Sequence, residues 1–189
     1  MNPFTSWSRS VDEVVRQGRI GTPVSVRVVD LTAADHGHVE ANLARAIEAA
    51  WGWLGSAPSF LRASGDVEAG HVTAMLRFAS GASAAITAGV SGVSVPRLEA
   101  HVVGNTGVVI WEPPDPNEPT DDHDPPLGEQ GRPPVPPDQL RVVLRAILSS
   151  SAQGRTVRLG DAGDEGSEFS RPAIDVNGAR PEAPQALSA

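Results

Sequence analysis

The stretch VVRQGRIGTPVSVRVVD, residues 14–30, leads from a helix into a strand and is the segment that decides the fold. Upstream of it, Ser10 is followed three residues later by a glutamate, and valines recur at helical spacing. We therefore expect a short helix with Ser10 as its N-cap. Gly18 and Gly21 end this helix and turn the chain. Valines then alternate with polar residues, which predicts a half-buried strand over 24–29.

The rest of the first 160 residues continues with one long helical pattern and several strand patterns. Apolar residues at helical spacing predict a helix over 39–54. Alternating runs and glycine turns predict strands at 60–63, 71–78, 82–90, 97–103, 108–111 and 156–159, and a further helix at 139–148. We interpret 70–111 as an antiparallel meander. These patterns predict an α+β fold, an open and mainly antiparallel sheet with helices packed on one face.

Composition divides the chain into a domain, an excursion and a tail. Residues 1–160 form the predicted domain. Within it, 113–137 holds ten of the 17 prolines, and six acidic residues without a basic one lie between Glu112 and Asp124. Prolines lack the N–H that helices and sheets need, so we expect a solvated excursion there. Residues 161–189 are polar and rich in glycine and proline, which predicts a loosely ordered tail.

The chain contains no lysine, no cysteine and no tyrosine, so every basic side chain apart from histidine is one of 15 arginines. Schiff-base lysines, cysteine nucleophiles and tyrosine acids are thereby excluded. The net charge of -8 argues against nucleic acid and against an anionic membrane surface as partners. The N-terminus has no apolar signal-peptide core and no apolar run reaches about 18 residues, so we expect a soluble cytoplasmic protein.

Three segments in this order resemble one known domain. They are the helix-to-strand entry at 14–24, the run LRFASGA at 76–82 and the run EAHVVGNTG at 99–107. Together they resemble the C-terminal domain of the glucose-fructose oxidoreductase / inositol dehydrogenase (Gfo/Idh/MocA) family, over 1–112 and over 139–159. The resemblance implies a sheet that serves substrate binding and oligomerisation beside an NAD(P)-binding Rossmann domain. These 189 residues contain no G-x-G-x-x-G fingerprint, so we expect no bound cofactor.

The family's catalytic elements are not preserved in this sequence. The Glu-Lys-Pro element is missing. The second element, Asp-x-Gly-x-His-x-x-Asp, lies at the start of the long helix. Anchored on Asp35, it places Val39 and Asn42 where the histidine and the last aspartate belong. Anchored on the helix end, it places Arg45 and Glu48 there. Valine cannot transfer a proton and arginine does not release one near neutral pH, so we predict no catalytic residue.

The same region supplies the candidate substrate-binding residues: His36, His38, Asn42, Arg45 and Glu48. A sugar or polyol is the ligand that the resemblance implies. The spacing of Arg45 and Glu48 suits either a simple ion pair or a pair that binds polyol or carboxylate.

A divalent metal at His36 and His38, with Asp35 and Glu40, is a further hypothesis, because imidazoles and carboxylates suit such ions. A polar turn at the entry to the helix explains the same residues without a metal. We predict no metal site.

Three functions remain open at this point. The first is a non-catalytic module that dimerises or binds a ligand through its sheet. The second is the substrate-domain subunit of an oxidoreductase whose Rossmann half is a separate chain. The third is an unrelated metal enzyme. We favour the first and expect a homodimer through an uncovered sheet face. The strand 82–90, with Ala84, Ile86, Ala88 and Val90 on one side, is the surface that we expect to associate.

Overall fold

A computed structural model describes residues 3–33, 38–91, 97–112 and 134–160. The helices are α1 (Pro3–Arg16), α2 (Val39–Leu54) and α3 (Pro137–Gln153). The strands are β1 (Pro23–Ala33), β2 (Pro58–Asp66), β3 (His71–Phe78), β4 (Ser83–Ser91), β5 (Arg97–Gly104), β6 (Val108–Trp111) and β7 (Val157–Arg158). The expected helices and strands are therefore present in the expected order, half of them longer than predicted and β7 shorter.

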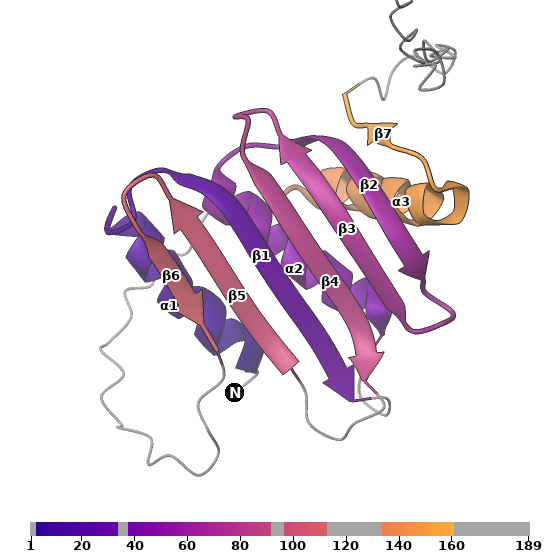
Figure 1. Ribbon diagram of the computed structural model, residues 1–189, viewed down its shortest axis with the longest axis horizontal. Coiled ribbons are helices and arrows are strands. Elements are labelled where there is room, and N and C mark those ends of the chain that lie inside the picture. Colours follow the sequence, from indigo (N-terminus) through magenta and orange to yellow (C-terminus); the bar gives the residue numbers. More distant parts are fainter. Residues whose placement is uncertain (1–2, 34–37, 92–96, 113–133, 161–189) are drawn as a thin grey trace, which may run out of the picture.

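The strands form one seven-stranded sheet in the order β6-β5-β1-β4-β3-β2-β7 (Figure 1). Neighbouring strands are antiparallel except β1 and β4, which are parallel. The predicted meander over 70–111 is therefore wrong at one place, because β1 lies between β4 and β5. The burial of the β1 side chains is consistent with this insertion. Along β1, Val26 and Val28 are buried on one side and Val29 is buried on the other, and a strand that is apolar on both faces belongs in the middle of a sheet.

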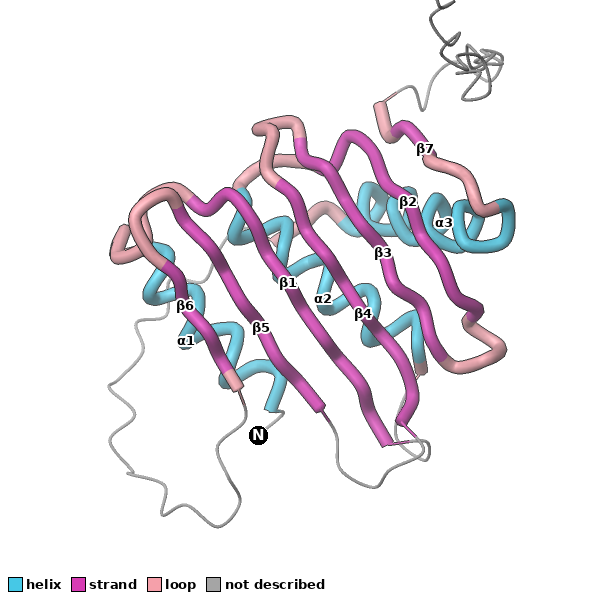
Figure 2. The backbone as a smooth tube through the Cα atoms, in the orientation of Figure 1, coloured by secondary structure: helices cyan, strands magenta, loops and turns pink. Residues whose placement is uncertain are grey.

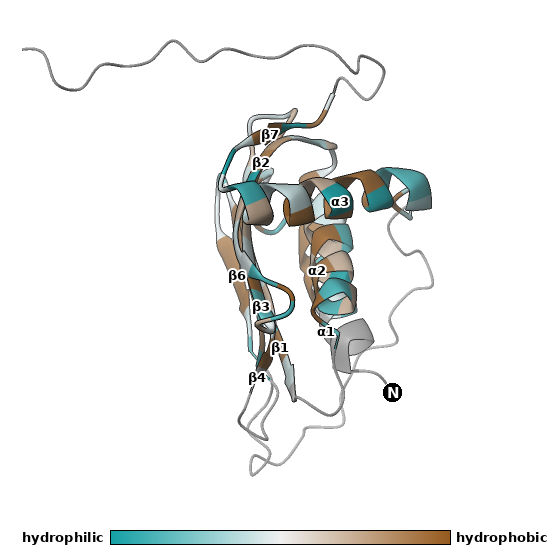
Figure 3. Cartoon of the chain, turned by 90° about the vertical axis from the view of Figure 1, so that its right-hand side faces the viewer, coloured by the Kyte–Doolittle hydropathy of each residue, from teal (hydrophilic) through white to brown (hydrophobic). Residues whose placement is uncertain are grey.

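All three helices lie on one face of the sheet, and Figure 3, which views the sheet edge-on, shows them as a separate layer beside the strands. The smooth trace of Figure 2 shows α2 crossing behind the central strands and α3 behind β2. The core fills the space between the layers. Its largest fully buried side chains include Phe78, Leu43, Ile47, Leu61 and Ile147. The expected α+β class, with helices on one face of an open sheet, is confirmed.

The uncovered face of β4 is the opposite of the one expected from the sequence. Ala84, Ile86 and Ala88 are each no more than 1% exposed and belong to the core beneath the helices. The outward residues of β4 are their alternating neighbours, such as Ala85 and Thr87. Period-two alternation identifies the two faces of a strand but does not say which face receives the helices.

The start of α1 also differs from the expectation. The helix begins at Pro3 and Ser10 lies inside it, so Ser10 is not an N-cap. Proline suits the first helical position because the N–H that it lacks would have no partner there. The two indoles near the end of α2 separate as their spacing requires. Trp53 is buried and donates its Nε1–H to Asp12 of α1 at 2.6 Å, whereas Trp51 is half-buried.

The turn between β5 and β6 packs against the loop that precedes β1. The Gly104 amide donates to the carbonyl of Gly107 at 2.8 Å and closes the expected hairpin. Thr106 donates its amide to the carbonyl of Ile20, and Thr22 donates its amide to Oδ1 of Asn105. A Cβ on Gly104 would lie 1.9 Å from the Ile20 oxygen, which explains the glycine at this point.

Several sequence predictions fall outside the described residues: the turn with Asp35 and His36, most of the excursion at 113–137, and the tail at 161–189. Among the residues that the structure does describe, no helix is both long enough and apolar enough to cross a membrane.

Candidate functional site

The first turn of α2 stands at the ends of the central strands. His38 precedes the helix with an extended backbone, and its carbonyl accepts the Asn42 amide at 3.1 Å. At the other end, Gly55 adopts the left-handed conformation and its amide caps the carbonyl of Trp51. Because both ends are fixed, the side chains along α2 have a definite register against the sheet.

A chain of polar contacts lies on the inner side of α2, among apolar neighbours. Asn42, only 1% exposed, donates Nδ2 to Oγ1 of Thr32 at 2.9 Å and to the carbonyl of Gly89 at 3.1 Å. Its Oδ1 accepts Nη2 of Arg45 at 2.6 Å. The same Nη2 lies 3.2 Å from Oδ2 of Asp30. These contacts tie α2 to both β1 and β4, and we call these five residues the α2–β1 network.

Asp30 is the most unusual member of the α2–β1 network. It occupies an inward position of β1, and its side chain is 4% exposed while that of Arg45 is 34% exposed. Burial raises the pKa of the Asp30 carboxyl, and the charge and hydrogen bond of Arg45 partly oppose that rise. Burial therefore disfavours the charged form of Asp30, and Arg45 offsets part of that cost.

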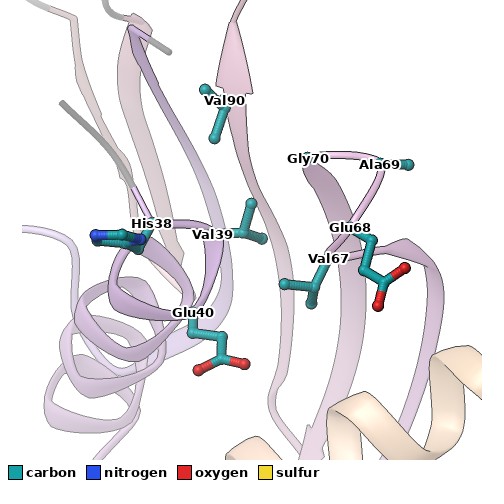
Figure 4. Close-up of a pocket in the computed structure, with 8 residues that line it drawn as sticks. All are labelled: His38, Val39, Glu40, Val67, Glu68, Ala69, Gly70 and Val90. Carbon is teal, nitrogen blue, oxygen red and sulfur yellow. The ribbon is translucent and has the colours of Figure 1, made fainter. Parts of the chain in front are cut away.

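A cavity of about 620 Å³ opens beside the first turn of α2, between this helix and the turn that joins β2 to β3. It is lined by His38, Val39, Glu40, Val67, Glu68, Ala69, Gly70 and Val90. In Figure 4, Val39 and Val67 face each other across the space, while the His38 ring points away from Glu68. The lining thus combines an apolar base with polar groups that can accept hydrogen bonds from hydroxyls.

The structure separates the candidate binding residues that the sequence suggested. His38 lines the cavity and is exposed. Asn42 and Arg45 belong to the α2–β1 network instead, and Glu48 is half-buried further along α2. His36 lies outside the described residues. Over the ranges described, no three His, Asp or Glu side chains gather as a metal site would require.

Sequence reasoning missed Asp30 and Glu68, and it considered Glu40 only as a possible metal ligand. Asp30 could have been found, because it falls at an inward position two residues after the buried Val28, where a carboxylate needs a partner. Glu40 and Glu68 could not have been associated with each other, since they come from a helix and a turn that only the folded sheet brings together.

Several solved structures that share this arrangement of helices and strands are dehydrogenases. The myo-inositol 2-dehydrogenase from Lactobacillus plantarum matches 83% of this chain with a TM-score of 0.65 and 17% identity. A putative myo-inositol dehydrogenase from Sinorhizobium meliloti matches 84% with a TM-score of 0.62 and 19% identity. The fold is that of one part of the inositol dehydrogenases. The expected resemblance to sugar and inositol dehydrogenases of the Gfo/Idh/MocA type is thus confirmed at the level of the fold.

The match has a clear limit in length. A levoglucosan dehydrogenase, solved in complex with NADH and L-sorbose, matches 83% of this chain with a TM-score of 0.59 and 16% identity, yet the match covers only 64% of that enzyme. The first two structures are covered to 63% and 62%. This chain therefore spans less than two thirds of the dehydrogenases that it matches. No protein-family model matches the chain, and no curated protein matches it by sequence.

Proposed function

We propose that this chain is a non-catalytic module with the fold of the substrate-side part of a sugar or polyol dehydrogenase, and that it acts by self-association and ligand binding. The observation that carries this proposal is the α2–β1 network. The positions at which the resemblance places the proton-transferring pair include Asn42 and Arg45, and both side chains are engaged in contacts that hold α2 on the sheet. Neither an amide nor a guanidinium transfers protons near neutral pH.

The ligand that suits the cavity is a sugar or polyol. Hydroxyl groups donate to carboxylates, and Glu40 and Glu68 supply these acceptors at the cavity that Val39 and Val67 line. Of the five candidate binding residues from the sequence, His38 is the one that lines this cavity. His36, outside the described residues, stays a sequence prediction.

The self-association surface that we propose is the outward side of β5 and β6. Val103, Val108 and Ile110 are 41%, 54% and 57% exposed there, and Val103 lies directly across from Val108. We call these three residues the apolar strip. Clustered exposed apolar side chains favour an interface, and a two-fold dimer is the commonest way for identical chains to cover one.

Ile110→Arg should prevent dimerisation without unfolding the domain, because a charge on the apolar strip would have to be desolvated in the dimer. Light scattering at micromolar concentration is the measurement. Val142→Arg is the matched control, since Val142 is a similarly exposed apolar residue on α3, at 44%. A parent chain that is monomeric, or an Ile110→Arg variant that still dimerises, would remove this part of the proposal.

A second candidate function is that of the substrate-domain subunit of an NAD(P)-dependent oxidoreductase whose Rossmann half is another chain. The coverage of about three fifths of the solved dehydrogenases favours it.

We expect no binding of NADH or NADPH to this chain alone, since pyrophosphate recognition uses a glycine fingerprint that the sequence lacks. Isothermal calorimetry at millimolar cofactor is the test. Saturable binding of one equivalent would contradict the non-catalytic proposal. Cofactor binding that requires a separately purified Rossmann protein would favour the second candidate.

A further inference from the structure

The face of the sheet that carries no helix has the opposite charge to the chain as a whole. The chain has a net charge of -8. Yet the strand register places five arginines outward on this face, namely Arg27, Arg62, Arg77, Arg97 and Arg158, all of them exposed. The outward carboxylates of the described strands are Glu99 and, at the end of β2, Asp66. A cluster of positive charge on the surface of an acidic protein favours binding of a negatively charged partner.

Two of these arginines share one carboxylate on this face. Arg27 lies 3.6 Å from one oxygen of Glu99, and Arg97 donates Nε–H to the other oxygen at 2.5 Å. Glu99 itself is only 13% exposed. Both oxygens of Glu99 are therefore occupied by arginines of β1 and β5.

The other three arginines surround an exposed apolar pair at the far side of the sheet. Phe60 of β2 lies directly across from Arg77 of β3 and from Arg158 of β7, and Arg62 follows two residues along β2. The guanidinium carbon of Arg158 is 5.7 Å from the centre of the Phe60 ring. Met75 lies directly across from Arg62. We call these five residues the arginine corner.

The two apolar side chains at the centre of the arginine corner are more exposed to solvent than is usual for large apolar residues. Phe60 is 43% exposed and Met75 is 54% exposed. The outward residues that continue these rows toward the middle of the sheet are Ser83 and Ala85, which carry no charge. The corner therefore presents an apolar centre with guanidinium groups on three sides, and the strands that the structure describes place no outward carboxylate in the same two rows.

We propose that the arginine corner binds an acidic segment of a protein partner, one that presents carboxylates around an apolar side chain. Guanidinium groups bind carboxylates through paired, charge-assisted hydrogen bonds. Arginine, methionine and phenylalanine are also the residue types enriched at protein interfaces. The apolar pair fills the centre of the contact, and the three arginines fix its orientation.

The positive charge of the arginine corner favours an acidic peptide over the other possible binding partners, a second copy of this chain or a nucleic acid. A second copy packed corner to corner would bring two sets of arginines together, which is unfavourable. A long polyanion such as nucleic acid would extend beyond the corner onto an acidic molecule, and its phosphates offer nothing to Phe60 and Met75. A short acidic and apolar peptide matches both the charge and the apolar centre.

This inference does not depend on the proposed function. The apolar strip is on β5 and β6, and β1 and β4 separate it from β3, β2 and β7. Dimerisation and peptide binding can therefore succeed or fail separately.

The test uses the full chain and a fluorescein-labelled peptide built from alternating pairs of glutamate and leucine, with binding followed by fluorescence anisotropy. The variant Arg62→Gln/Arg77→Gln/Arg158→Gln should bind this peptide roughly ten-fold more weakly than the parent chain, since each exposed charge pair contributes modestly. The matched control is Arg141→Gln/Arg145→Gln/Arg155→Gln. It removes the same charge from exposed residues of α3 and the turn after it, and its affinity should stay within about two-fold of the parent value.

A second probe separates charge from apolar contact. The same peptide with glutamine in place of glutamate should lose the binding, and added salt should weaken binding of the original peptide. Equal binding by the two triple variants would overturn the proposal. So would equal binding of the glutamine peptide, or tighter binding of a labelled single-stranded oligonucleotide that the arginine corner variant abolishes.

Discussion

Ile86→Arg should unfold the domain. Ile86 is 0% exposed and belongs to the core between β4 and α2. Arginine there would place an unpaired charge in that core, which costs about 3–5 kcal/mol or more and is comparable to the whole stability of a small domain. We expect loss of the cooperative thermal transition in circular dichroism.

Met75→Arg is the control for this experiment. Met75 lies on the adjacent strand β3, points to the opposite face of the sheet and is 54% exposed. Its replacement should change stability by less than about 0.5 kcal/mol, as is usual for surface positions. If Met75→Arg unfolded the domain and Ile86→Arg did not, the helices would lie on the other face of the sheet.

Arg45→Met should be the second severe substitution. It leaves the Asp30 carboxylate buried without the guanidinium that accompanies it, and breaking one partner of a buried pair costs about 3–5 kcal/mol. Because the Arg45 side chain is one-third exposed, we expect a value near the lower end of that range. Urea unfolding at neutral pH is the measurement.

The double variant Asp30→Leu/Arg45→Met tests whether the unpaired Asp30 carboxylate causes this loss of stability. With both charges replaced by apolar groups, most of the lost stability should return. A double variant that is no more stable than Arg45→Met alone would show that the arginine acts through packing and not through its charge.

The pH dependence follows from the raised pKa of Asp30. A carboxyl whose pKa is higher in the folded than in the unfolded chain binds its proton more tightly when folded. Its contribution to stability is therefore greatest below the unfolded pKa and is lost as pH rises through the folded value. Removing Arg45 takes away the interaction that opposes this rise. The difference in stability between Arg45→Met and the parent chain should therefore be smaller at about pH 4 than at pH 7.

Local patterns were sufficient to predict α2 and the β5–β6 hairpin. α2 has apolar residues at helical spacing and a glycine after its last turn, and the hairpin has a glycine at each end of its turn. Both depend on contacts between residues close in sequence, which is why the sequence alone reveals them.

The position of β1 could not be predicted in this way. Val28 pairs with Ile86 and with Ala100, and no local pattern encodes partners so distant in sequence. The candidate site shows the same limit. The spacing of Arg45 and Glu48 suggested a partner within the helix, whereas the structure shows an ion pair between Arg45 and Asp30 of β1.

The central place of β1 has a consequence for the order in which the chain folds. During synthesis β1 emerges before every other strand, yet its parallel partner β4 begins at residue 83 and its antiparallel partner β5 at residue 97. Both edges of a Val-rich strand stay unpaired until then, and pairing across such long separations is slow. A polypeptide released before β5 is complete would expose an unpaired edge of β1, which can pair with other chains. Aggregation during synthesis should therefore be most frequent before β5 has been made.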